Sequence, residues 1–380
     1  MARAGQATEK HKTARSKGGR PGSAQSRRRE RRRRGEAHKP GVRGKAREWL
    51  DALVFALVAA LVIRTLFFEA FRIPTPSMEK NLLVGDFLLV SKMHYGTRLP
   101  ITLGIPFTDI YLPSFELPYF RLPGFGDVKR GDSFVFNYPP EDAPIDRKTH
   151  YIKRAMGLPG DTLEVRAKQV YINGELIPLD KRMQLEWVVE KSSPEVRLPG
   201  PRLRELGVEQ VVPLRDRSEV LIRFATTEAA DQIASWPYVE RVEPFVEPRG
   251  ARNGSGTYPP GRDFTRDNYG PVYIPAKGAT VALDDESWDL YQTVITRYEG
   301  HSGRRTGPGR YEIDGKVAES YTFSQNYYFA MGDNRDNSLD SRFWGFVPEE
   351  HVVGKAFLIY FSWDSDKHFP RFGRLLNLIH

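Results

Sequence analysis

The sequence predicts a mostly β protein with one transmembrane helix near its N-terminus. Short runs of β-favouring residues follow Gly-Asp pairs at 85–86, 131–132 and 160–161, and an Asn-Gly pair at 173–174 separates two more, as in a hairpin. Long amphipathic helical patterns are missing from the body of the sequence. One apolar stretch is long enough to cross a bilayer.

The composition fits a chain of two or three domains without thiol chemistry. Its 380 residues are 40% hydrophobic and 12% aromatic, which is enough for a sizeable core, and none is cysteine. Disulfides, thiolate metal sites and a cysteine nucleophile are therefore excluded. We expect neither a cofactor nor a metal ion.

Residues 1–47 are predicted to form a basic, disordered tail on the cytoplasmic side. They hold 17 Lys and Arg against three Glu, a net charge of +14, so the other 333 residues carry −5 of the chain's +9. Binding to anionic lipid or nucleic acid is one interpretation, and a solvated tail that fixes topology is the simpler one. Because no aromatic residues interleave the arginines, we expect no specific nucleic-acid partner.

Residues 48–68 are predicted to form a transmembrane signal-anchor helix. An unbroken run of 12 apolar residues, 52–63, lies within a 20-residue stretch, 49–68, whose polar residues are near its two ends. A helix of that length spans about 30 Å, the thickness of the hydrocarbon layer. The region before it is too long for a cleaved signal peptide. The basic side stays in the cytoplasm, so we expect a single-pass protein of the cytoplasmic (inner) membrane with its body on the outer face.

The body divides by composition into a core and an insertion. Residues 69–177 and 319–365 contain the predicted core strands, among them the run from Val352 to Trp363. The proline-rich residues 99–126 are interpreted as a surface excursion, either a lid or a membrane-facing loop. Residues 178–318 are predicted to form an inserted α+β domain, and residues 366–380 a C-terminal tail. Within the insertion we expect strands at 219–224 and 238–246 and a helix at 227–236.

Ser77, just past the membrane-length stretch, is the first candidate for chemistry. Pro74 and Pro76 fix the backbone on either side of Thr75, so that the hydroxyl of Ser77 is presented on a stiff, extended segment. Thr75 places a second hydroxyl nearby. Taken alone, a serine near prolines is more often a turn residue than a nucleophile.

Lys153 is the second candidate, in a predicted strand. Strand alternation places Lys153 and Arg154 on opposite faces, so that one faces inward and the other faces solvent. A lysine is a general base only when it is uncharged, which requires apolar burial to lower its pKa. The alternative interpretation is an ordinary exposed lysine.

The segment 332–342, GDNRDNSLDSR, is dense in small polar and charged residues between apolar flanks. Such flanks predict that the segment is drawn into the fold, where its polar groups must bond with one another. The candidate pairs are Asp340 with Arg342, and Asp333 or Asp336 with Arg335 or Arg154.

Together these segments resemble the bacterial type I signal peptidases, a family of membrane-anchored Ser-Lys proteases. The resemblance rests on five stretches that follow the family's order: 73–78, 84–92, 129–132, 151–161 and 332–348. It covers roughly residues 60–175 and 325–362.

The resemblance implies a role for each candidate residue. Ser77 matches the nucleophile, Lys153 the general base, and Thr75 the side-chain oxyanion donor that acts with the Ser77 backbone N–H. Ser338 matches the residue that orients the lysine ammonium. The supporting residues that it implies or that we expect are Asp340, Arg342, Arg154 and Asp333.

The family's fold and activity follow as expectations. They are a β-rich catalytic core with an inserted second domain, and a serine endopeptidase that removes signal peptides from secreted preproteins after a small-x-small motif. The expected partners are these preproteins and membrane lipids. Pro76 stands where many members have glycine, residues 79–81 replace a more usual Pro-Thr-Leu, and only one of the family's frequent two anchors is visible.

Two alternatives belong to other functional classes. One is a catalytically silent, membrane-anchored scaffold of the same fold, whose basic tail binds nucleic acid or lipid. The other is a cytoplasmic Ser-Lys self-cleaving repressor, which would need a DNA-binding helical domain where this chain has a membrane-length stretch.

Overall fold

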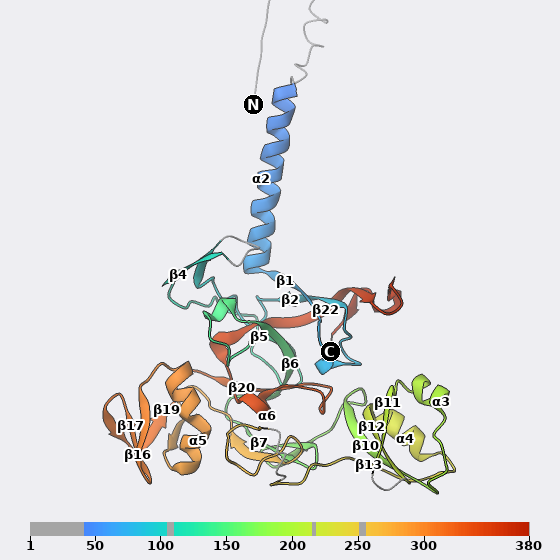
Figure 1. Cartoon of the computed structure of the whole chain (residues 1–380). Coiled ribbons are helices and arrows are strands. Elements are labelled where there is room, and N and C mark those ends of the chain that lie inside the picture. Colours follow the sequence, from blue (N-terminus) through green and yellow to red (C-terminus); the bar gives the residue numbers. More distant parts are fainter. Residues whose placement is uncertain (1–41, 105–109, 215–217, 251–255, 380) are drawn as a thin grey trace, which may run out of the picture. The chain divides into compact units, whose positions relative to one another are not determined.

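A computed structural model describes residues 42–104, 110–214, 218–250 and 256–379. The chain divides into two compact units, residues 1–59 and 60–380, and α2 (Val42–Leu66) belongs to both. Of the tail expected at residues 1–47, residues 1–41 lie outside the described ranges. Figure 1 shows the order of the elements along the chain.

Helix α2 is, among the described residues, the one helix that is long and apolar enough to cross a membrane. Its span from Arg47 to Leu66 has 20 residues and a mean hydropathy of 2.0. The helix ends two residues before the expected limit, because Phe68 begins strand β1 and pairs with Ser91. It also begins earlier than expected, so residues 42–47 are helical; Lys45, Ala46 and Arg47 are all good helix formers.

The second unit is built on a nine-stranded antiparallel sheet that joins distant parts of the sequence. The strand order is β1-β2-β22-β5-β6-β20-β21, and β23 and β24 also pair with β22. The bounds are β1 Phe68–Arg72, β2 Asp86–Ser91, β5 Ser133–Asn137, β6 His150–Gly157, β20 Tyr327–Met331, β21 Val347–Pro348, β22 Val352–Asp364, β23 Phe369–Pro370 and β24 Asn377–Leu378. The mostly β class is therefore confirmed.

The glycines in the predicted Gly-Asp turns are required by the backbone conformation there. Gly85, Gly131 and Gly160 have φ of 91°, 89° and 92°, a region that residues with a Cβ rarely adopt. The hairpin predicted at 173–174 joins β8 (Gln169–Ile172) to β9 (Glu175–Ile177), with positive φ at both turn residues. The apolar run predicted near the C-terminus is strand β22.

Both faces of the main sheet are covered along β5 and β20, whose residues are all buried. On β5, Phe134 and Phe136 pack into one hydrophobic cluster and Val135 into another, as strand alternation requires. Lys153 of β6 is paired in register with Phe134. Residues 153–157 of β6 are buried on both faces, whereas the strand is exposed where it begins at His150.

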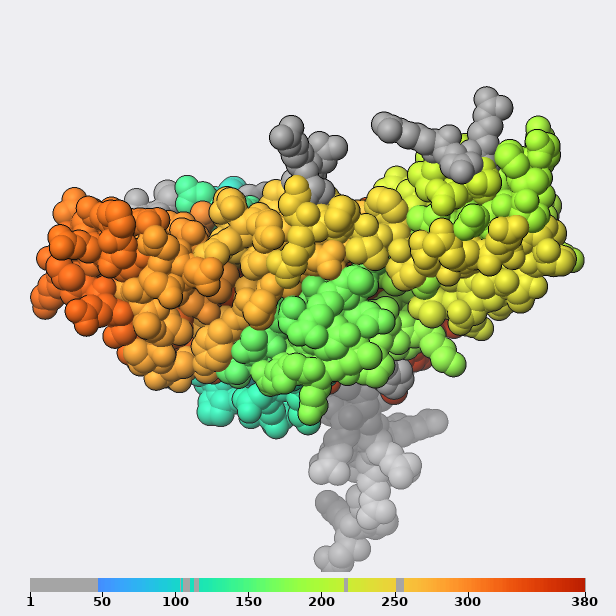
Figure 2. Space-filling model, turned by 90° about the horizontal axis from the view of Figure 1, so that it is seen from below, coloured from blue at the N-terminus to red at the C-terminus, as the bar shows by residue number. Residues whose placement is uncertain are grey.

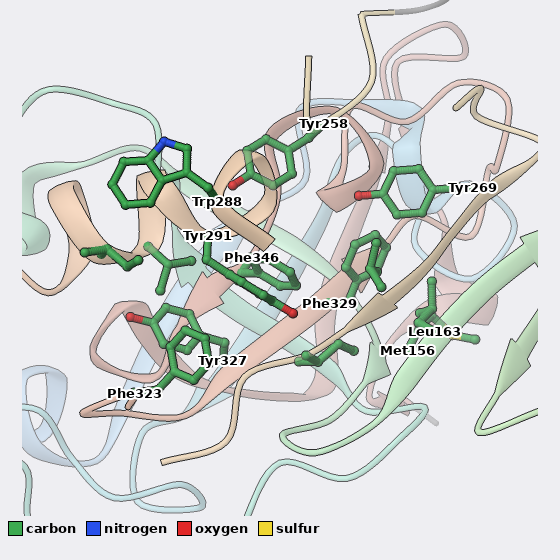
Figure 3. Packing of buried hydrophobic residues seen from close by; sticks show 14 of the residues in the cluster. Met156, Leu163, Tyr258, Tyr269, Trp288, Tyr291, Phe323, Tyr327, Phe329 and Phe346 are labelled. Carbon is green, nitrogen blue, oxygen red and sulfur yellow. The ribbon is translucent and has the colours of Figure 1, made fainter. Parts of the chain in front are cut away.

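Residues 158–326 connect β6 to β20 and contain two hydrophobic cores. The first has a sheet with the order β14-β7-β8-β9, where β7 is Thr162–Arg166 and β14 is Tyr269–Tyr273. It packs with α5 (Asp285–Thr293) and a π-helical turn, Val294–Tyr298, around a cluster of aromatic side chains that includes Phe329 of β20 (Figure 3). Beside it are β15 Thr280–Ala282 with β19 Ser320–Thr322, and the sheet of β16 Gly303–Gly307, β17 Arg310–Ile313 and β18 Lys316–Ala318.

The second core belongs to a sheet with the order β11-β12-β10-β13. Its elements are β10 Gln184–Lys191, α3 Gly200–Glu205, β11 Gln210–Pro213, β12 Glu219–Thr226, α4 Thr227–Ala234 and β13 Val239–Pro244. The strands and helix predicted at 219–246 are thus confirmed as β12, α4 and β13. Figure 2 shows both parts on the surface of this unit, residues 184–244 in green to yellow and residues 280–318 in orange. The limits of the inserted domain stay a prediction.

The proline-rich residues 99–126 contain a short hairpin of β3 (Thr102–Gly104) and β4 (Tyr111–Glu116). Several large apolar side chains within residues 99–126 are exposed, namely Ile110, Leu112, Tyr119, Phe120 and Phe125. Its use as a lid or a membrane-facing loop stays a prediction.

Candidate active site

Ser77 lies in a single 3₁₀ turn, Pro76–Met78, that follows β1. Pro76 suits the first position of such a turn because its fixed φ is already helical. The backbone before the turn is tied to β2, since Ile73 N–H donates to Asp86 O at 2.8 Å and Gly85 N–H donates to Ile73 O at 3.0 Å. Ser77 is 7% exposed, so its hydroxyl has a fixed and nearly dry position.

Lys153 comes from β6 and reaches the same place. Its Nζ lies 2.6 Å from Ser77 Oγ and 3.1 Å from the carbonyl oxygen of Ile152. The side chain is 4% exposed, and burial lowers its pKa from the ordinary 10.5 to about 8. An amine with this pKa is partly uncharged near neutral pH, so it can accept a proton from the hydroxyl beside it.

A cavity of about 620 Å³ opens onto these two side chains. Its lining comes from three segments: residues 73–78, residues 149–153 and residues 336–339. Thr75 and Ser338 both line it, so the structure gathers all four expected catalytic and orienting residues around one space. Thr75 itself is exposed, with an extended backbone at φ −129° and ψ 152°.

Ser338 does not make the contact that the resemblance implies. It is 8% exposed, and its Oγ has no hydrogen-bond partner among the described residues. The partners of Lys153 Nζ are Ser77 and the Ile152 carbonyl instead. Ser338 packs directly on Gly332, where an added Cβ would lie 2.2 Å from Ser338 Oγ. The orienting role of Ser338 stays a prediction.

Asp340 and Arg342 form the expected ion pair behind the cavity. Arg342 Nε donates to Asp340 Oδ1 and Nη2 to Oδ2, each at 2.8 Å, and both residues are at most 2% exposed. Burial alone would raise the pKa of Asp340, but the charge of Arg342 holds it below its usual value. Asp340 Oδ2, which accepts from Arg342 Nη2, also accepts the Gly332 N–H at 3.0 Å. The pair therefore fixes the backbone on which Ser338 packs.

Arg154 is buried, contrary to the expectation that either it or Lys153 would face solvent. It is 8% exposed and donates twice to Asp333, from Nε and Nη2, each at 2.7 Å. The expectation is wrong because alternation assigns faces, and both faces of this sheet are covered. A guanidinium in such a place requires a carboxylate partner, which Asp333 supplies.

Arg335 also differs from expectation, because it pairs with neither Asp333 nor Asp336. Its Nε donates to Gly332 O at 3.1 Å, and its Nη2 contacts the sulfur atoms of Met156 and Met183. Burial lowers its pKa to about 10.

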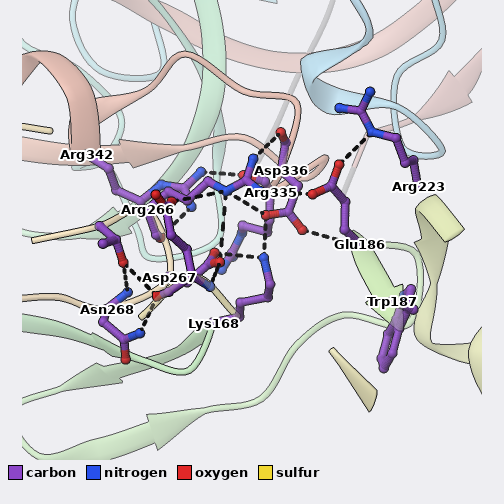
Figure 4. A network of polar contacts seen from close by, with 12 residues as sticks. Lys168, Glu186, Trp187, Arg223, Arg266, Asp267, Asn268, Arg335, Asp336 and Arg342 are labelled. Atoms are coloured by element: carbon purple, nitrogen blue, oxygen red, sulfur yellow. Dashed lines mark hydrogen bonds and ion pairs between the residues drawn. The ribbon is translucent and has the colours of Figure 1, made fainter. Parts of the chain in front are cut away.

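Asp336 pairs instead with Lys168, on the turn between β7 and β8. Lys168 Nζ contacts Asp336 Oδ1 and donates to Asp267 Oδ1 at 2.7 Å. Figure 4 shows this network, in which Arg266 joins Asp336 to Glu186 of β10. No feature of the sequence singled out Lys168, which lies in a turn with φ of +71°.

Asn334 is a second residue that sequence reasoning did not single out. Its backbone N–H donates to Ser77 O at 3.0 Å and its Nδ2 to Pro76 O at 3.2 Å. Asn81 makes a parallel link, donating from Nδ2 to Asp333 Oδ2 at 2.6 Å. These bonds hold the turn with Ser77 against residues 332–342. The one available signal for Asn334 was its place in the polar segment 332–342.

The start of β10 is bonded to the same segment. Gln184 N–H donates to Asp333 O at 2.9 Å, and Arg335 N–H donates to Gln184 O at 3.0 Å. The part of the insertion that has its own core is thereby tied to the segment behind the cavity. No group of three or more His, Cys, Asp or Glu in the described ranges is placed to hold a metal ion.

The sequence matches a known family over well over half of its length. The model for signal peptidase, peptidase S26, matches residues 46–207 and 273–363. The chain is 29% identical over 337 residues to Signal peptidase I of Pseudomonas aeruginosa, which covers 85% of this chain and 76% of that protein. It is 29% identical over 316 residues to Signal peptidase I of Aquifex aeolicus (83% and 84% covered), and 28% over 327 residues to that of Rickettsia massiliae (84% and 82%). The chain therefore belongs to the signal peptidase family, peptidase S26.

Proposed function

We propose that Ser77 is the nucleophile and Lys153 its general base in the hydrolysis of preproteins. Through its family the chain is a type I signal peptidase, a serine endopeptidase that acts on proteins bearing signal peptides. The observation that carries the assignment of residues is the 2.6 Å distance between Lys153 Nζ and Ser77 Oγ, in a place where burial lowers the pKa of the lysine.

The reaction takes two steps with a covalent intermediate. Uncharged Lys153 takes the hydroxyl proton of Ser77 while Oγ attacks the scissile carbonyl carbon, and the protonated lysine then gives that proton to the leaving amine. An ester joins the signal peptide to Ser77 at this point. Lys153, uncharged again, takes a proton from a water molecule that attacks the ester, and returns it to Ser77 Oγ as the ester breaks.

Each tetrahedral intermediate carries a negatively charged oxygen, the oxyanion, which must be stabilised by hydrogen-bond donors. We assign these to the Thr75 hydroxyl and the Ser77 backbone N–H, because Thr75 lines the cavity and its position is set by the prolines beside it. Loss of one such donor commonly costs about 3–4 kcal/mol in the transition state.

The supporting residues act on the segment behind the cavity. Asp340 and Arg342 hold Gly332, and Arg154 holds Asp333, which in turn accepts from Asn81 beside the Ser77 turn. We assign Ser338 to the orientation of the ammonium once Lys153 is protonated, since it lines the same cavity.

The finer substrate and location follow from the same proposal. We propose cleavage after a small-x-small motif, by a body on the outer face of the cytoplasmic membrane, with the N-terminus in the cytoplasm and lipids in contact with the protein. The membrane-length span from Arg47 to Leu66 and the 17 basic residues among the first 47 support this orientation. Neither alternative function, the silent scaffold or the self-cleaving repressor, has an observation in its favour.

A cleavage assay tests the proposal. The full chain in detergent is incubated with a purified preprotein, and the cut is mapped by mass spectrometry. Ser77→Ala is expected to abolish cleavage, whereas Ser193→Ala, which removes an exposed hydroxyl from the insertion, is expected to leave it unchanged. Cleavage at the same bond by Ser77→Ala would end the assignment.

A further inference from the structure

A second cavity, of about 780 Å³, lies beside the catalytic one where α2 ends. Its lining includes Leu61, Arg64 and Thr65, which belong to the last two turns of the membrane-length helix. It shares Thr149 and His150, at the start of β6, with the lining of the catalytic cavity. The position on the helix places this cavity at the edge of any bilayer that α2 crosses.

The lining of this cavity is strongly cationic. Five basic side chains contribute to it: Arg64, Lys92, Arg98, Arg147 and Lys148. The lining carboxylates are Glu69 and Asp146, which leaves a formal excess of three positive charges. Outside the lining, the carboxylates of Glu141, Asp142 and Glu350 and the guanidinium groups of Arg121 and Arg297 interact with Arg98 or Lys148. With these groups counted as well, the formal excess is two positive charges.

The two carboxylates are already engaged. Glu69 pairs with Lys92 at 2.8 Å and with Arg64 at 3.1 Å. Asp146 accepts the backbone N–H groups of Ile101 and Thr102, at 3.0 and 2.9 Å. The charge of Glu69 is therefore balanced by its two cations, whereas Asp146 is held by neutral donors and keeps its charge within the cavity.

Three of the cations are hydrogen-bonded to neutral oxygens, and one of them is Arg147, whose Nε donates to Thr102 Oγ1 at 2.8 Å. Arg98 donates to the backbone carbonyl of Glu350 and to Asn137 Oδ1, both at 2.8 Å. Lys148, which is 7% exposed, donates to the carbonyl of Pro139 at 3.1 Å. Burying positive charge against neutral acceptors is costly, and an anion in the adjoining cavity would offset part of that cost.

Part of the remaining lining is apolar, beside Thr65, Thr102, Thr149 and His150, and this apolar part distinguishes a lipid from a free anion. Leu61, Leu99, Pro100 and Val353 face the same cavity as the basic side chains. A small inorganic ion gains nothing from such a wall, whereas the glycerol and first methylenes of a phospholipid do. The basic side chains match the anionic headgroup of such a lipid, and the apolar wall matches its glycerol and methylenes.

We propose that this cavity binds the phosphodiester headgroup of an anionic membrane phospholipid. The inference rests on the proposed insertion of α2 in a membrane, and not on the chemistry assigned to Ser77 and Lys153. The bound headgroup lies next to Thr149 and His150, and so beside the space where the preprotein is cut.

Photo-crosslinking of the full chain in detergent micelles tests this proposal. The probe is phosphatidylglycerol with a photoreactive group on its headgroup, and labelled peptides are identified by mass spectrometry. We expect labels on the peptides that contain residues 92–102 and 146–150. Labels on the basic tail are resolved separately, because they fall on other peptides. Unlabelled phosphatidylglycerol should compete at the cavity, and equimolar phosphatidylcholine should compete at least fivefold less well.

Variants with matched controls sharpen the test. A double variant, Lys92→Gln with Arg147→Gln, should lower labelling of the cavity peptides at least fivefold and leave tail labelling unchanged. Arg241→Gln with Arg304→Gln removes the same charge from exposed strands outside the cavity and should have no effect. A thermal melt of each variant checks that it is folded. The lipid competition uses only the wild-type chain, so it tests the proposal even if a variant does not fold.

Three outcomes would overturn the proposal. They are the absence of wild-type labels from the cavity peptides, equal competition by phosphatidylcholine, and full competition by inorganic phosphate, which would make this a site for the free ion. Because labelling requires no turnover, its failure is distinct from a failure of Ser77→Ala to abolish cleavage.

Discussion

Lys153 Nζ lies 2.6 Å from Ser77 Oγ although the two residues are 76 positions apart and come from different elements, β6 and the 3₁₀ turn after β1. The contact depends on a third segment, since Asn334 bonds the backbone of the Ser77 turn and Asp333 bonds Arg154, the neighbour of Lys153. The segment 332–342 therefore sets the distance between base and nucleophile.

Replacing Lys153 by arginine should inactivate the enzyme. Arginine keeps the positive charge and most of the length, but it stays protonated at any pH at which the protein is folded, so it cannot accept the Ser77 proton. We expect kcat to fall by at least about a hundredfold, the usual contribution of a general base. Lys316→Arg, on the exposed strand β18, is the matched control and should be fully active. Wild-type turnover by Lys153→Arg would refute a neutral base.

Activity should depend on pH through the same lysine. Below pH 8 the amine is increasingly protonated and cannot accept a proton, so kcat/KM should fall about tenfold per unit at low pH. Above pH 8 it should level off as the uncharged form becomes the major one. Initial rates of preprotein cleavage from pH 5.5 to pH 9.5 measure this curve. A flat profile across that range would contradict the assignment.

Replacing Gly332 by alanine should damage both stability and activity. A Cβ there would lie 2.2 Å from Ser338 Oγ and 2.6 Å from Ser77 O, so the segment must shift. Overpacking of this kind costs about 1–3 kcal/mol in the free energy of unfolding, and displacement of Ser77 should lower kcat about a hundredfold. Gly126→Ala has open space around its Cβ and serves as the control. Denaturant unfolding and cleavage assays report the two effects, and a Gly332→Ala protein as stable and active as the control would show that the contact is not tight.

Replacing Asp340 by asparagine should destabilise the fold more than removal of a carboxylate whose ion-pair partner is exposed. The change leaves the buried guanidinium of Arg342 without a counter-charge, which typically costs about 3–5 kcal/mol. The control is Glu312→Gln, which breaks an ion pair with the exposed Arg304 and should cost less than about 1 kcal/mol. Equal midpoints of urea unfolding for the two variants would show that the Asp340 pair does not support the fold.

The chemistry of the site was largely predictable because it is concentrated in short segments. Ser77, Thr75 and Lys153 stand in local contexts that the sequence displays, and Asp340 is only two positions from its partner Arg342. The mostly β class was predictable for a similar reason, because turn glycines and alternating runs are local signals.

What could not be predicted depends on contacts between distant segments. The burial of Arg154 required knowledge that both faces of β6 are covered. The bonds from Asn334 to the Ser77 turn and from Lys168 to Asp336 join residues more than 150 positions apart. For Ser338, the position at the cavity was expected from the sequence, but its packing on Gly332 was not.

The central claim is that Lys153 is a weakened base held against Ser77, and its pKa is the quantity to measure. Lysine side chains labelled with ¹⁵N can be titrated by NMR in the full chain in micelles, and the Lys153→Arg variant identifies the signal that belongs to Lys153. The account predicts a midpoint near 8. A midpoint at or above the ordinary value of 10.5 would mean that the amine is charged at working pH, and the proposed mechanism would be wrong.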